Sequence, residues 1–342
     1  MFRILKALIL LAFLAVICAG GGLWWYAQRP IPMGPGSVDL NIPSGSSTRG
    51  AARIAAAVVP VQPDVLVGLA RISGRDTQIK AGSYEIEPGT TPIGLIDQLT
   101  RGDVSLQEVR IPEGWTFHQF RAALDAHPAV THASQGMSDA ALLAQVAQAE
   151  GGGGPAANGD QYPEGLFFPD TYLFAKGAKD TDILRRSYRL MKKRIVGEWE
   201  KRAPGLPYTS PYQALIMASI VEKETGQTKE RPLIAGVFIN RLKKGMLLQT
   251  DPTIIYGMGV NFDGNLRKRD LLEDGPYNSY TRTGLPPTPI ALPGVAAIQA
   301  ALHPADTDAI YFVAKGNGTH EFSSTLEAHN RAVNRYQKKQ AG

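Results

Sequence analysis

The sequence begins with a long apolar stretch, after which short apolar segments of two periodicities alternate with turns. Residues 7–26 carry no charge, and about 20 such residues are enough for a helix to cross the apolar core of a bilayer. The stretch ends in Trp24, Trp25 and Tyr26, aromatic residues that are typical of a membrane interface. The pattern predicts one membrane-spanning helix within residues 1–28, which comprise a short cytoplasmic end and the anchor.

The charges that flank this stretch predict its orientation. Arg3 and Lys6 precede it, whereas only Arg29 follows closely, and positive charges favour the cytoplasmic side of a membrane. We therefore expect a single-pass protein of the inner membrane with a cytoplasmic N-terminus and a periplasmic remainder. A cleaved signal peptide is the main alternative, but the apolar run exceeds the usual length and no clear small-x-small cleavage site follows.

The cysteine content agrees with export. Cys18 is the only cysteine and lies inside the apolar stretch, so the exported part has no thiol and no disulfide. A lipid-modified cysteine is the alternative reading, but Ile17 is bulkier than the small residue usual before such a site. The sequence favours a thiol embedded in the membrane.

Beyond the anchor, residues 29–37 are rich in proline and glycine and predict a stiff tether. Three segments then repeat one plan, in which a short strand, a turn with Pro and Gly and a Ser or Thr helix cap precede an amphipathic helix. Repeated units of this kind predict a small α+β domain over residues 38–150. The segments are residues 38–47, 84–91 and 108–116, followed by helices that contain residues 54–59, 95–99 and 117–124.

The middle unit, residues 84–91, resembles the opening of a LysM glycan-binding module. A plain structural unit and a sugar-binding module are both consistent with it. Residues 151–160 include four consecutive glycines and predict a flexible loop. A larger α+β domain then follows over residues 161–342, with a helix over 182–201, a hairpin of strands 308–314 and 319–323, and a closing helix over 325–340.

Composition and charge narrow the function classes. The chain has 342 residues, 44% hydrophobic and 20% charged, and a formal net charge of +5. No stripe of Arg and Lys interleaved with aromatic residues is present, nor a zinc or helix-turn-helix pattern, which argues against nucleic acid as a partner. The six histidines lack metal-ligand spacing, so we expect neither a metal site nor a cofactor.

A helix over residues 211–225 is the segment that points to chemistry. Ser210 before Pro211, with Gln213 three residues after the serine, predicts a capping box at its start, and Gly226 predicts its end. Residues 214–221 are apolar on nearly every face, which indicates a buried helix.

Glu222 comes directly after this apolar run. A carboxyl group held beside apolar neighbours has a raised pKa, which suits a general acid near neutral pH. Lys223 and Glu224 point about 100° and 200° away from Glu222 around the helix. The alternative is that all three are solvated charges at the end of the helix.

The motifs around this helix closely resemble the MltG, or YceG-like, family of endolytic murein transglycosylases. Their order and spacing match throughout, and the resemblance covers nearly the whole chain, apart from the glycine-rich stretch. The motifs are residues 218–225, 237–242, 248–253, 256–257, 277–280 and 284–290, and the resemblance extends to 302–304, 311–314 and 329–330.

The resemblance implies cleavage of the β-1,4 bond between N-acetylmuramic acid and N-acetylglucosamine inside a peptidoglycan glycan strand. The product is a 1,6-anhydromuramyl end, and such cuts would limit strand elongation. The resemblance assigns the catalytic role to the first glutamate of the Glu-Lys-Glu pair, Glu222. It also implies peptidoglycan synthases as partners, although no residue reveals this association.

Polar residues in two loop-like segments are candidates for substrate binding. Gln249, Thr250, Asp251, Asn278 and Tyr280 could bind acetamido or hydroxyl groups of the sugar, or they could instead satisfy turns. A hydrolase of the same bond would need a second carboxylate, and Asp251 stays open for that role. A membrane-anchored scaffold that binds glycan without cutting it is the remaining alternative.

Overall fold

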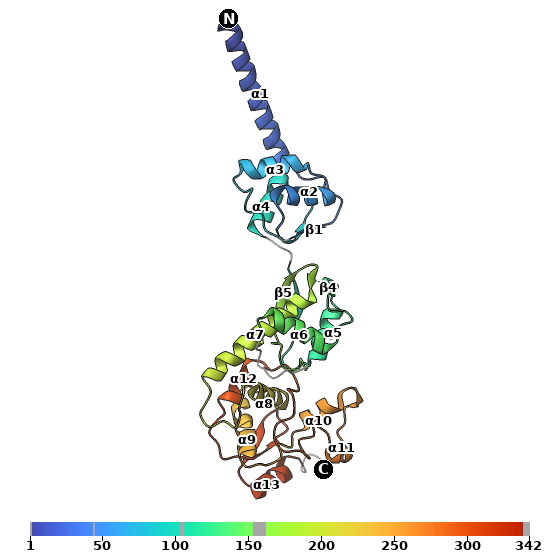
Figure 1. Cartoon of the computed structure of the whole chain (residues 1–342), viewed down its shortest axis with the longest axis vertical. Helices are drawn as coiled ribbons and strands as arrows, with labels where there is room; N and C mark the ends of the chain where they lie inside the picture. The colour runs from blue at the N-terminus through green and yellow to red at the C-terminus, as the bar shows by residue number, and fades with distance from the viewer. Residues whose placement is uncertain (1, 44, 103–105, 153–161, 338–342) are drawn as a thin grey trace. The chain divides into compact units, whose positions relative to one another are not determined.

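The computed structural model describes residues 2–43, 45–102, 106–152 and 162–337 of the chain (Figure 1). Most of the predicted glycine-rich loop, residues 153–160, lies outside the described residues. The described residues combine helices with four two-stranded sheets, which confirms the expected mixture of α and β structure. The chain divides into two compact units: unit 1 is Met1–Glu108 with Leu173–Ala178, and unit 2 is Val109–Tyr172 with Lys179–Gly342.

Helix α1, Phe2–Gln28, confirms the predicted N-terminal apolar helix. Its segment Ile9–Gln28 has a mean hydropathy of 1.9, a length and composition that fit a membrane anchor or a signal sequence. Trp24 and Trp25 are exposed on this helix, as expected for side chains of a membrane interface.

The segment after α1 is packed into unit 1 rather than held away from it as a tether. Ala27 and Ile31 are buried in the core of the unit. The backbone N–H of Ile31 donates to the Thr90 carbonyl at 2.8 Å, and the N–H of Gln62 donates to the Tyr26 hydroxyl at 3.2 Å. Residues 29–37 therefore differ from the expected spacer, because the apolar side chains between their prolines cover the core.

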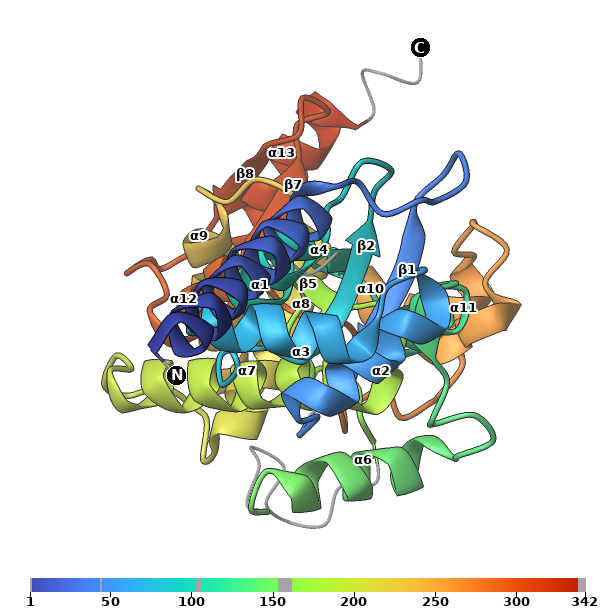
Figure 2. The ribbon, with the colours of Figure 1, turned by 90° about the horizontal axis from the view of Figure 1, so that it is seen from above.

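Unit 1 is built on an antiparallel ribbon of two strands, which lie side by side in Figure 2. The register pairs Val38 with Ile86 and Ile42 with Gly82, and the buried side chains of the ribbon face the helices. Helix α2 packs on β1 and α3, and α4 packs on α3 and β2. The elements are β1 (Val38–Ile42), α2 (Thr48–Val58), α3 (Pro63–Ile72), β2 (Gly82–Ile86) and α4 (Pro92–Arg101).

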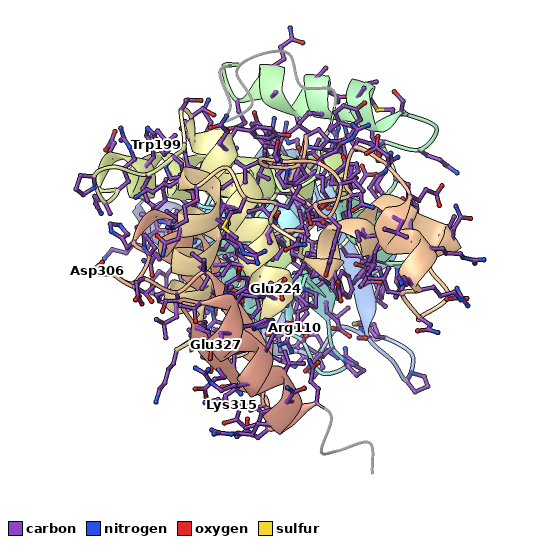
Figure 3. The ribbon with its side chains drawn as sticks, turned by 90° about the horizontal axis from the view of Figure 1, so that it is seen from below. Arg110, Trp199, Glu224, Asp306, Lys315 and Glu327 are labelled. Atoms are coloured by element: carbon purple, nitrogen blue, oxygen red, sulfur yellow. The ribbon has the colours of Figure 1, made fainter. Side chains whose placement is uncertain are left out.

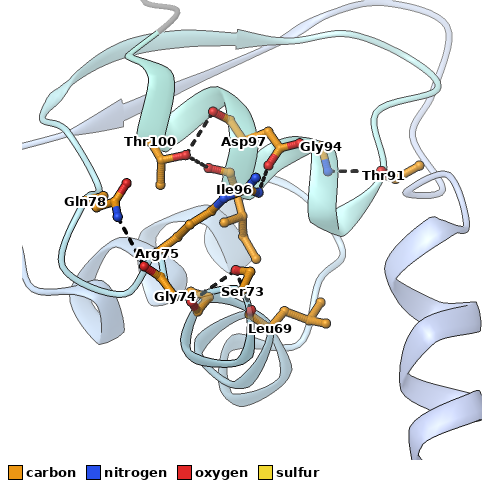
Figure 4. Close-up of polar contacts among 11 residues, drawn as sticks. Leu69, Ser73, Gly74, Arg75, Gln78, Thr91, Gly94, Ile96, Asp97 and Thr100 are labelled. Carbon is orange, nitrogen blue, oxygen red and sulfur yellow. Dashed lines mark hydrogen bonds and ion pairs between the residues drawn. The ribbon is translucent and has the colours of Figure 1, made fainter.

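The three predicted strand–turn–helix units share their local geometry. Each turn contains a glycine at positive φ, and each following helix starts with a Ser or Thr hydroxyl that accepts a hydrogen bond from the N–H three residues later. Figure 4 shows one such cap, Thr91 with Gly94, next to the ion pair of Arg75 with Asp97. The glycines are Gly45, Gly89 and Gly114, and the caps are Ser47, Thr91 and Thr116.

The third of these units falls mostly in unit 2, so the division at residue 108 comes earlier than the boundary expected near residue 150. Aromatic packing is the reason. Phe117 and Phe120 lie 4.7 and 6.3 Å from the ring of Phe167, and Phe120 stacks on Tyr172 at 6.1 Å. The elements here are β3 (Leu106–Arg110), α5 (Phe117–Asp125), β4 (Val130–Thr131) and α6 (Asp139–Ala149); β3 pairs with β5 (Thr171–Ala175), and β4 with β6 (Ala178–Lys179).

The rest of unit 2 surrounds helix α8, which contacts α7, α9, α10 and α12. The predicted helix over 182–201 and the hairpin are confirmed by α7 and by β7 with β8. Helix α13 confirms the closing helix as far as residue 336, and residues 338–340 of that prediction lie outside the described residues. The elements are α7 (Asp180–Glu200), α8 (Pro211–Glu224), α9 (Arg231–Lys243), α10 (Asp251–Met258), the short 3-10 helix η1 (Gly259–Asn261), α11 (Lys268–Leu272), α12 (Val295–Leu302), β7 (Tyr311–Ala314), β8 (His320–Ser323) and α13 (Leu326–Tyr336).

Helix α8 is buried as predicted, since all eight residues from Ala214 to Val221 are buried. Its start differs in detail from the expected capping box. The Ser210 hydroxyl accepts a hydrogen bond from the backbone N–H of Gln213 at 3.3 Å. The side-chain oxygen Oε1 of Gln213, however, accepts from the N–H of Thr209, one residue before the cap. The helix ends at Glu224, with Thr225 in an extended conformation.

Candidate active site

The last turn of α8 places two glutamates, Glu222 and Glu224, in different surroundings. Two residues along an α-helix correspond to a rotation of about 200°, so the two carboxyl groups leave the helix on nearly opposite sides. Figure 3 labels Glu224 at this end of α8.

Glu222 is held in a closed network of charges and backbone groups. Its Oε1 lies 2.6 Å from Nη2 of Arg231, the first residue of α9, and both side chains are almost fully buried. Its Oε2 accepts a hydrogen bond from the N–H of Gly294 at 3.0 Å. Both carboxylate oxygens therefore already bind donors of the protein.

The third repeat turn covers this network. Gly114 lies so close that a Cβ added there would sit 3.8 Å from Cγ of Glu222, and Lys223 Nζ donates to the Gly114 carbonyl at 3.2 Å. Glu113 Oε2 lies 3.8 Å from Nη1 of Arg231. A Cβ added at Gly294 would lie 1.7 Å from Oε1 of Glu113, so the half-exposed Glu113 side chain would have to move to admit it.

Burial raises the pKa of Glu222, while the Gly294 N–H and the positive charge of Arg231 act in the opposite direction. A raised pKa alone fits a general acid. In this arrangement both oxygens of Glu222 bind protein donors, so neither points to an open space; the catalytic role of Glu222 stays a prediction.

Glu224 instead lines a cavity of about 430 Å³ in unit 2, a volume in the usual range for small-ligand sites. The cavity combines polar and aromatic side chains from the end of α8, the segment before α10, the hairpin β7–β8 and α13. Its lining is Glu224, Arg241, Leu248, Gln249, Asp251, Tyr280, Ile310, Tyr311, Phe312, Val313, Ala314, His320, His329, Val333 and Gln337.

One hydrogen bond holds the Glu224 carboxyl. The Thr250 hydroxyl donates to Oε1, and no lysine or arginine of the described ranges forms an ion pair with this carboxyl. Burial raises the pKa of Glu224; the Thr250 hydroxyl opposes this effect, and the charge of Asp251 adds to it. Oε2 of Glu224 accepts no hydrogen bond from the described part of the chain, so this group can hold a proton for transfer.

The structure brings together four of the five predicted substrate-binding residues. Gln249, Asp251 and Tyr280 line the cavity with Glu224, and Thr250 contacts the glutamate directly. The Tyr280 hydroxyl donates to Asp251 Oδ1 at 2.6 Å. Asp251, which the sequence places on a loop remote from the helix, is the first residue of α10 and lies close enough to influence the Glu224 carboxyl.

Asn278 is placed differently. Its side-chain amide donates to the carbonyls of Asp270, Leu271 and Glu273, at 3.2, 3.2 and 2.6 Å, and its oxygen accepts from the N–H of Tyr280 at 2.9 Å. All of these bonds brace the loop that presents Tyr280. Asn278 is buried and does not line the cavity.

Gln249 has an unusual backbone conformation beside the cavity. Its φ of 52° is the only positive value at a non-glycine residue in the described ranges. Arg241 holds this segment, with Nη1 donating to the carbonyls of Leu247 and Leu248 and, at 3.2 Å, to Oε1 of Gln249. Such strained residues cluster at functional sites.

Sequence reasoning missed Glu224 as the cavity-lining acid, and it gave no role to Arg241, Tyr311 or His329. Arg241, Tyr311 and His329 all fall within the motifs of the family resemblance, which was the available signal. His329 stacks on Tyr311 at 5.1 Å, and its buried Nδ1 has no hydrogen-bond partner among the described residues. Burial, helped by the charge of Arg241, lowers the pKa of His329 and so favours the neutral form of its ring.

One group of side chains elsewhere in unit 2 has the composition of a metal site. Ligand atoms of Asp125, His132 and Asp180 lie within 4.8 Å of one another. Asp180 already accepts hydrogen bonds from the N–H and hydroxyl of Ser134 and from the N–H of Thr181. These donors account for the buried carboxylate without an ion, and the group lies outside the cavity of Glu224.

Comparison with known proteins identifies the relatives of this chain. Residues 40–335 match the model of the YceG-like family. An endolytic murein transglycosylase of Bacillus subtilis is 34% identical over 310 residues, which cover 88% of this chain and 85% of the relative. An endolytic murein transglycosylase of Streptococcus pneumoniae is 27% identical, with 94% of this chain and 63% of the relative covered.

A solved structure agrees with this family. The crystal structure of a YceG-like protein from Listeria monocytogenes superposes with a TM-score of 0.57 at 31% sequence identity. The match covers 86% of this chain and 98% of the Listeria chain.

Proposed function

The chain belongs to the YceG-like family, and from this premise we propose that it cuts peptidoglycan with Glu224 as its single catalytic acid and base. It is an endolytic murein transglycosylase, a lyase of the cell wall, like its curated relatives. The glycosidic bond it cleaves is the β-1,4 bond between N-acetylmuramic acid and N-acetylglucosamine. Cleavage within strands would limit their elongation.

One carboxyl group suffices for this reaction. Protonated Glu224 donates its proton to the glycosidic oxygen as the bond from that oxygen to C1 of the muramyl sugar breaks. The carboxylate then takes the proton of the muramyl 6-hydroxyl as its oxygen bonds to C1. The products are a 1,6-anhydromuramyl end and a free hydroxyl on N-acetylglucosamine, no water is consumed, and Glu224 is protonated again.

Access supports Glu224 rather than Glu222. Glu224 faces a cavity large enough for a sugar, and its Oε1 alone is held by Thr250, which leaves Oε2 for the proton transfer. Glu222 is enclosed by Arg231, Gly294 and the turn at Gly114. We assign Glu222 to the support of the α8 terminus, because its ion pair joins α8 to α9.

The other cavity residues would bind and orient the sugar. Tyr280, Asp251 and Gln249 offer hydrogen-bonding groups to hydroxyl and acetamido substituents, and Thr250 acts through Glu224. Asn278 would act indirectly, by positioning Tyr280.

A second glycan site fits unit 1. The turn of the middle repeat forms an open cavity of about 490 Å³ lined by Glu85, Thr90, Thr91, Gln98 and Arg101, among others. These polar side chains match the hydroxyl-rich surface of a glycan, which supports the LysM-like interpretation of this domain. The variant Gln98→Ala tests this assignment. We expect it to retain glycan strands more weakly than wild type and to cleave soluble fragments at an unchanged rate.

The anchor sets the location we propose. Helix α1 would cross the inner membrane once with its N-terminus in the cytoplasm, so that both units reach peptidoglycan in the periplasm. Peptidoglycan synthases are the proposed protein partners, because a strand-cutting enzyme must meet strands as they are made.

The deciding experiment is mass spectrometry of purified peptidoglycan digested by the wild-type chain, Glu224→Gln and Glu222→Gln. Anhydromuramyl ends from wild type and their loss in Glu224→Gln, with residual product from Glu222→Gln, are the expected result. Loss in Glu222→Gln alone would move the catalytic role to Glu222.

The same digest separates the alternatives. Reducing muramyl ends instead of anhydro ends would indicate a hydrolase, with Asp251 as the candidate second carboxylate. No cleavage by a folded wild-type chain that still binds glycan strands would indicate a scaffold.

A further inference from the structure

A cavity of about 310 Å³ lies where helix α1 joins the body of unit 1. Its walls are the rings of Trp25 and Tyr26, the side chain of Arg29 and four prolines, together with Ile31 and Val61. All of these residues belong to unit 1, and none belongs to the proposed glycan sites. Arg29 is the one charged residue of this lining.

The charged donor of this cavity is the Arg29 guanidinium, because the backbone around it offers almost no free N–H group. The four prolines have no N–H, and the N–H groups of Ile31 and Val61 already donate to the carbonyls of Thr90 and Val59. The Arg29 guanidinium lies 4.8 Å from the ring of Trp25 and pairs with no acid in the described part of the chain. A ligand here therefore needs acceptor oxygens, a negative charge and an apolar part.

The aromatic residues of α1 indicate where the cavity would lie relative to the membrane surface. Trp24 and Trp25 are exposed, as in an interfacial aromatic belt. Arg29 comes four residues after Trp25, a rise of about 6 Å along the helix axis. The side chain of Arg29 folds back onto Trp25, so its guanidinium lies at the level of the aromatic belt, where the lipid headgroups would be.

The junction between α1 and the rest of unit 1 is held by buried side chains and a hydrogen bond. Ala27 and Ile31 are buried in the core of unit 1, and Tyr26 accepts a hydrogen bond from the N–H of Gln62. These contacts hold unit 1 in a fixed orientation at the end of α1.

We propose that this cavity binds the headgroup of an anionic phospholipid, with the phosphate paired to Arg29 and the glycerol backbone against the prolines and Trp25. The inference goes beyond the proposed catalysis and rests on α1 as a membrane anchor. Bound lipid would hold unit 1 against the periplasmic leaflet and so set its height above the membrane. Arg29 also follows the C-terminal end of α1, where a cation is favourable in itself, so lipid retention must be measured directly.

Native mass spectrometry of the full chain in mild detergent tests the site, with equal amounts of phosphatidylglycerol and phosphatidylethanolamine added. We expect wild type to retain one phosphatidylglycerol in preference to phosphatidylethanolamine. Arg29→Gln should lower this retention about fivefold, the usual effect of one basic residue near an anionic surface. Arg29→Lys should keep most of it, because the charge remains.

Arg53→Gln is the matched control, since Arg53 is an exposed arginine of α2 in the same unit, outside the cavity. It should retain phosphatidylglycerol as wild type does. Equal retention by Arg29→Gln and wild type would overturn the proposal, as would an equal loss in Arg53→Gln. An intact mass that shows cleavage before Arg29 would also overturn it, whereas loss of activity in Glu224→Gln is independent of it.

Discussion

Nη2 of Arg231 lies 2.6 Å from Oε1 of Glu222, in an ion pair whose two side chains are only 6% and 5% exposed. Two residues later on the same helix, Glu224 faces a cavity and accepts one hydrogen bond from Thr250. On this contrast we base the proposal that Glu222 supports the fold and that Glu224 exchanges a proton with the substrate.

Glu222→Gln should reduce stability more than it reduces activity per folded molecule. Removing one charge of a buried pair leaves the other unpaired, at a cost of about 3 kcal/mol. Urea unfolding of the detergent-solubilised chain measures this loss. The double variant Glu222→Met with Arg231→Met should recover part of it, because no unpaired charge remains. Unchanged stability with abolished activity in Glu222→Gln would contradict the supporting role.

Thr250→Val should move the pH dependence of cleavage. The Thr250 hydroxyl donates to the Glu224 carboxylate and thereby favours the charged form, so its loss raises the pKa of Glu224 further above its ordinary value. The general acid must be protonated, so the basic limb of kcat/KM should move to higher pH. Thr250→Ser keeps the hydroxyl and should follow wild type. A basic limb that stays in place in Thr250→Val would show that this hydrogen bond does not tune the acid.

Gln249→Gly and Gln249→Ala form a matched pair for the strained backbone at the cavity. Both variants lose the contact of the side chain with Arg241, but only glycine adopts a φ of 52° without steric cost. The glycine variant should be more stable than the alanine variant by about 1 kcal/mol, as measured by denaturant unfolding. Equal stabilities would mean that the conformation carries no strain.

Glu164 should make stability depend on pH. It is buried and accepts hydrogen bonds from the N–H of Phe117 at 2.9 Å and from the hydroxyl of Tyr256 at 3.2 Å, so it links α5 to α10. Burial raises its pKa to about 7, from an ordinary value of 4.5. The folded chain therefore holds a proton there that the unfolded chain releases between pH 4.5 and 7.

The stability contributed by this proton is complete below pH 4.5 and is lost as pH rises to about 7. The expected loss is about 3 kcal/mol relative to Glu164→Gln, whose amide does not titrate. Unfolding free energies of both proteins across this range test the prediction. Parallel curves for wild type and Glu164→Gln would show that Glu164 titrates at its ordinary pKa.

Local structure could be predicted well because its causes are local. The strand–turn–helix units follow from turn glycines and from Ser or Thr caps, and α8 follows from Ser210, Pro211 and an apolar run of eight residues. The hairpin β7–β8 follows from the turn that joins its strands. Ordered motifs over most of the chain likewise indicated the family, since each keeps its spacing.

Contacts between segments that are far apart in the sequence determined the features that the sequence did not predict. The sequence shows two glutamates on opposite sides of one helix end, and it predicted the catalytic role for Glu222. Arg231 of α9, Gly294 before α12 and the turn at Gly114 enclose Glu222. Glu224, on the other side of the helix, lines the cavity. The division into two units likewise depends on the packing of Phe117 and Phe120 on Phe167. Residues 29–37 do not form a free tether because Ile31 is buried in the core of unit 1. Helix periodicity gives the direction of a side chain, but burial and charge partners come from chain segments tens of residues away, and only the tertiary structure brings these together.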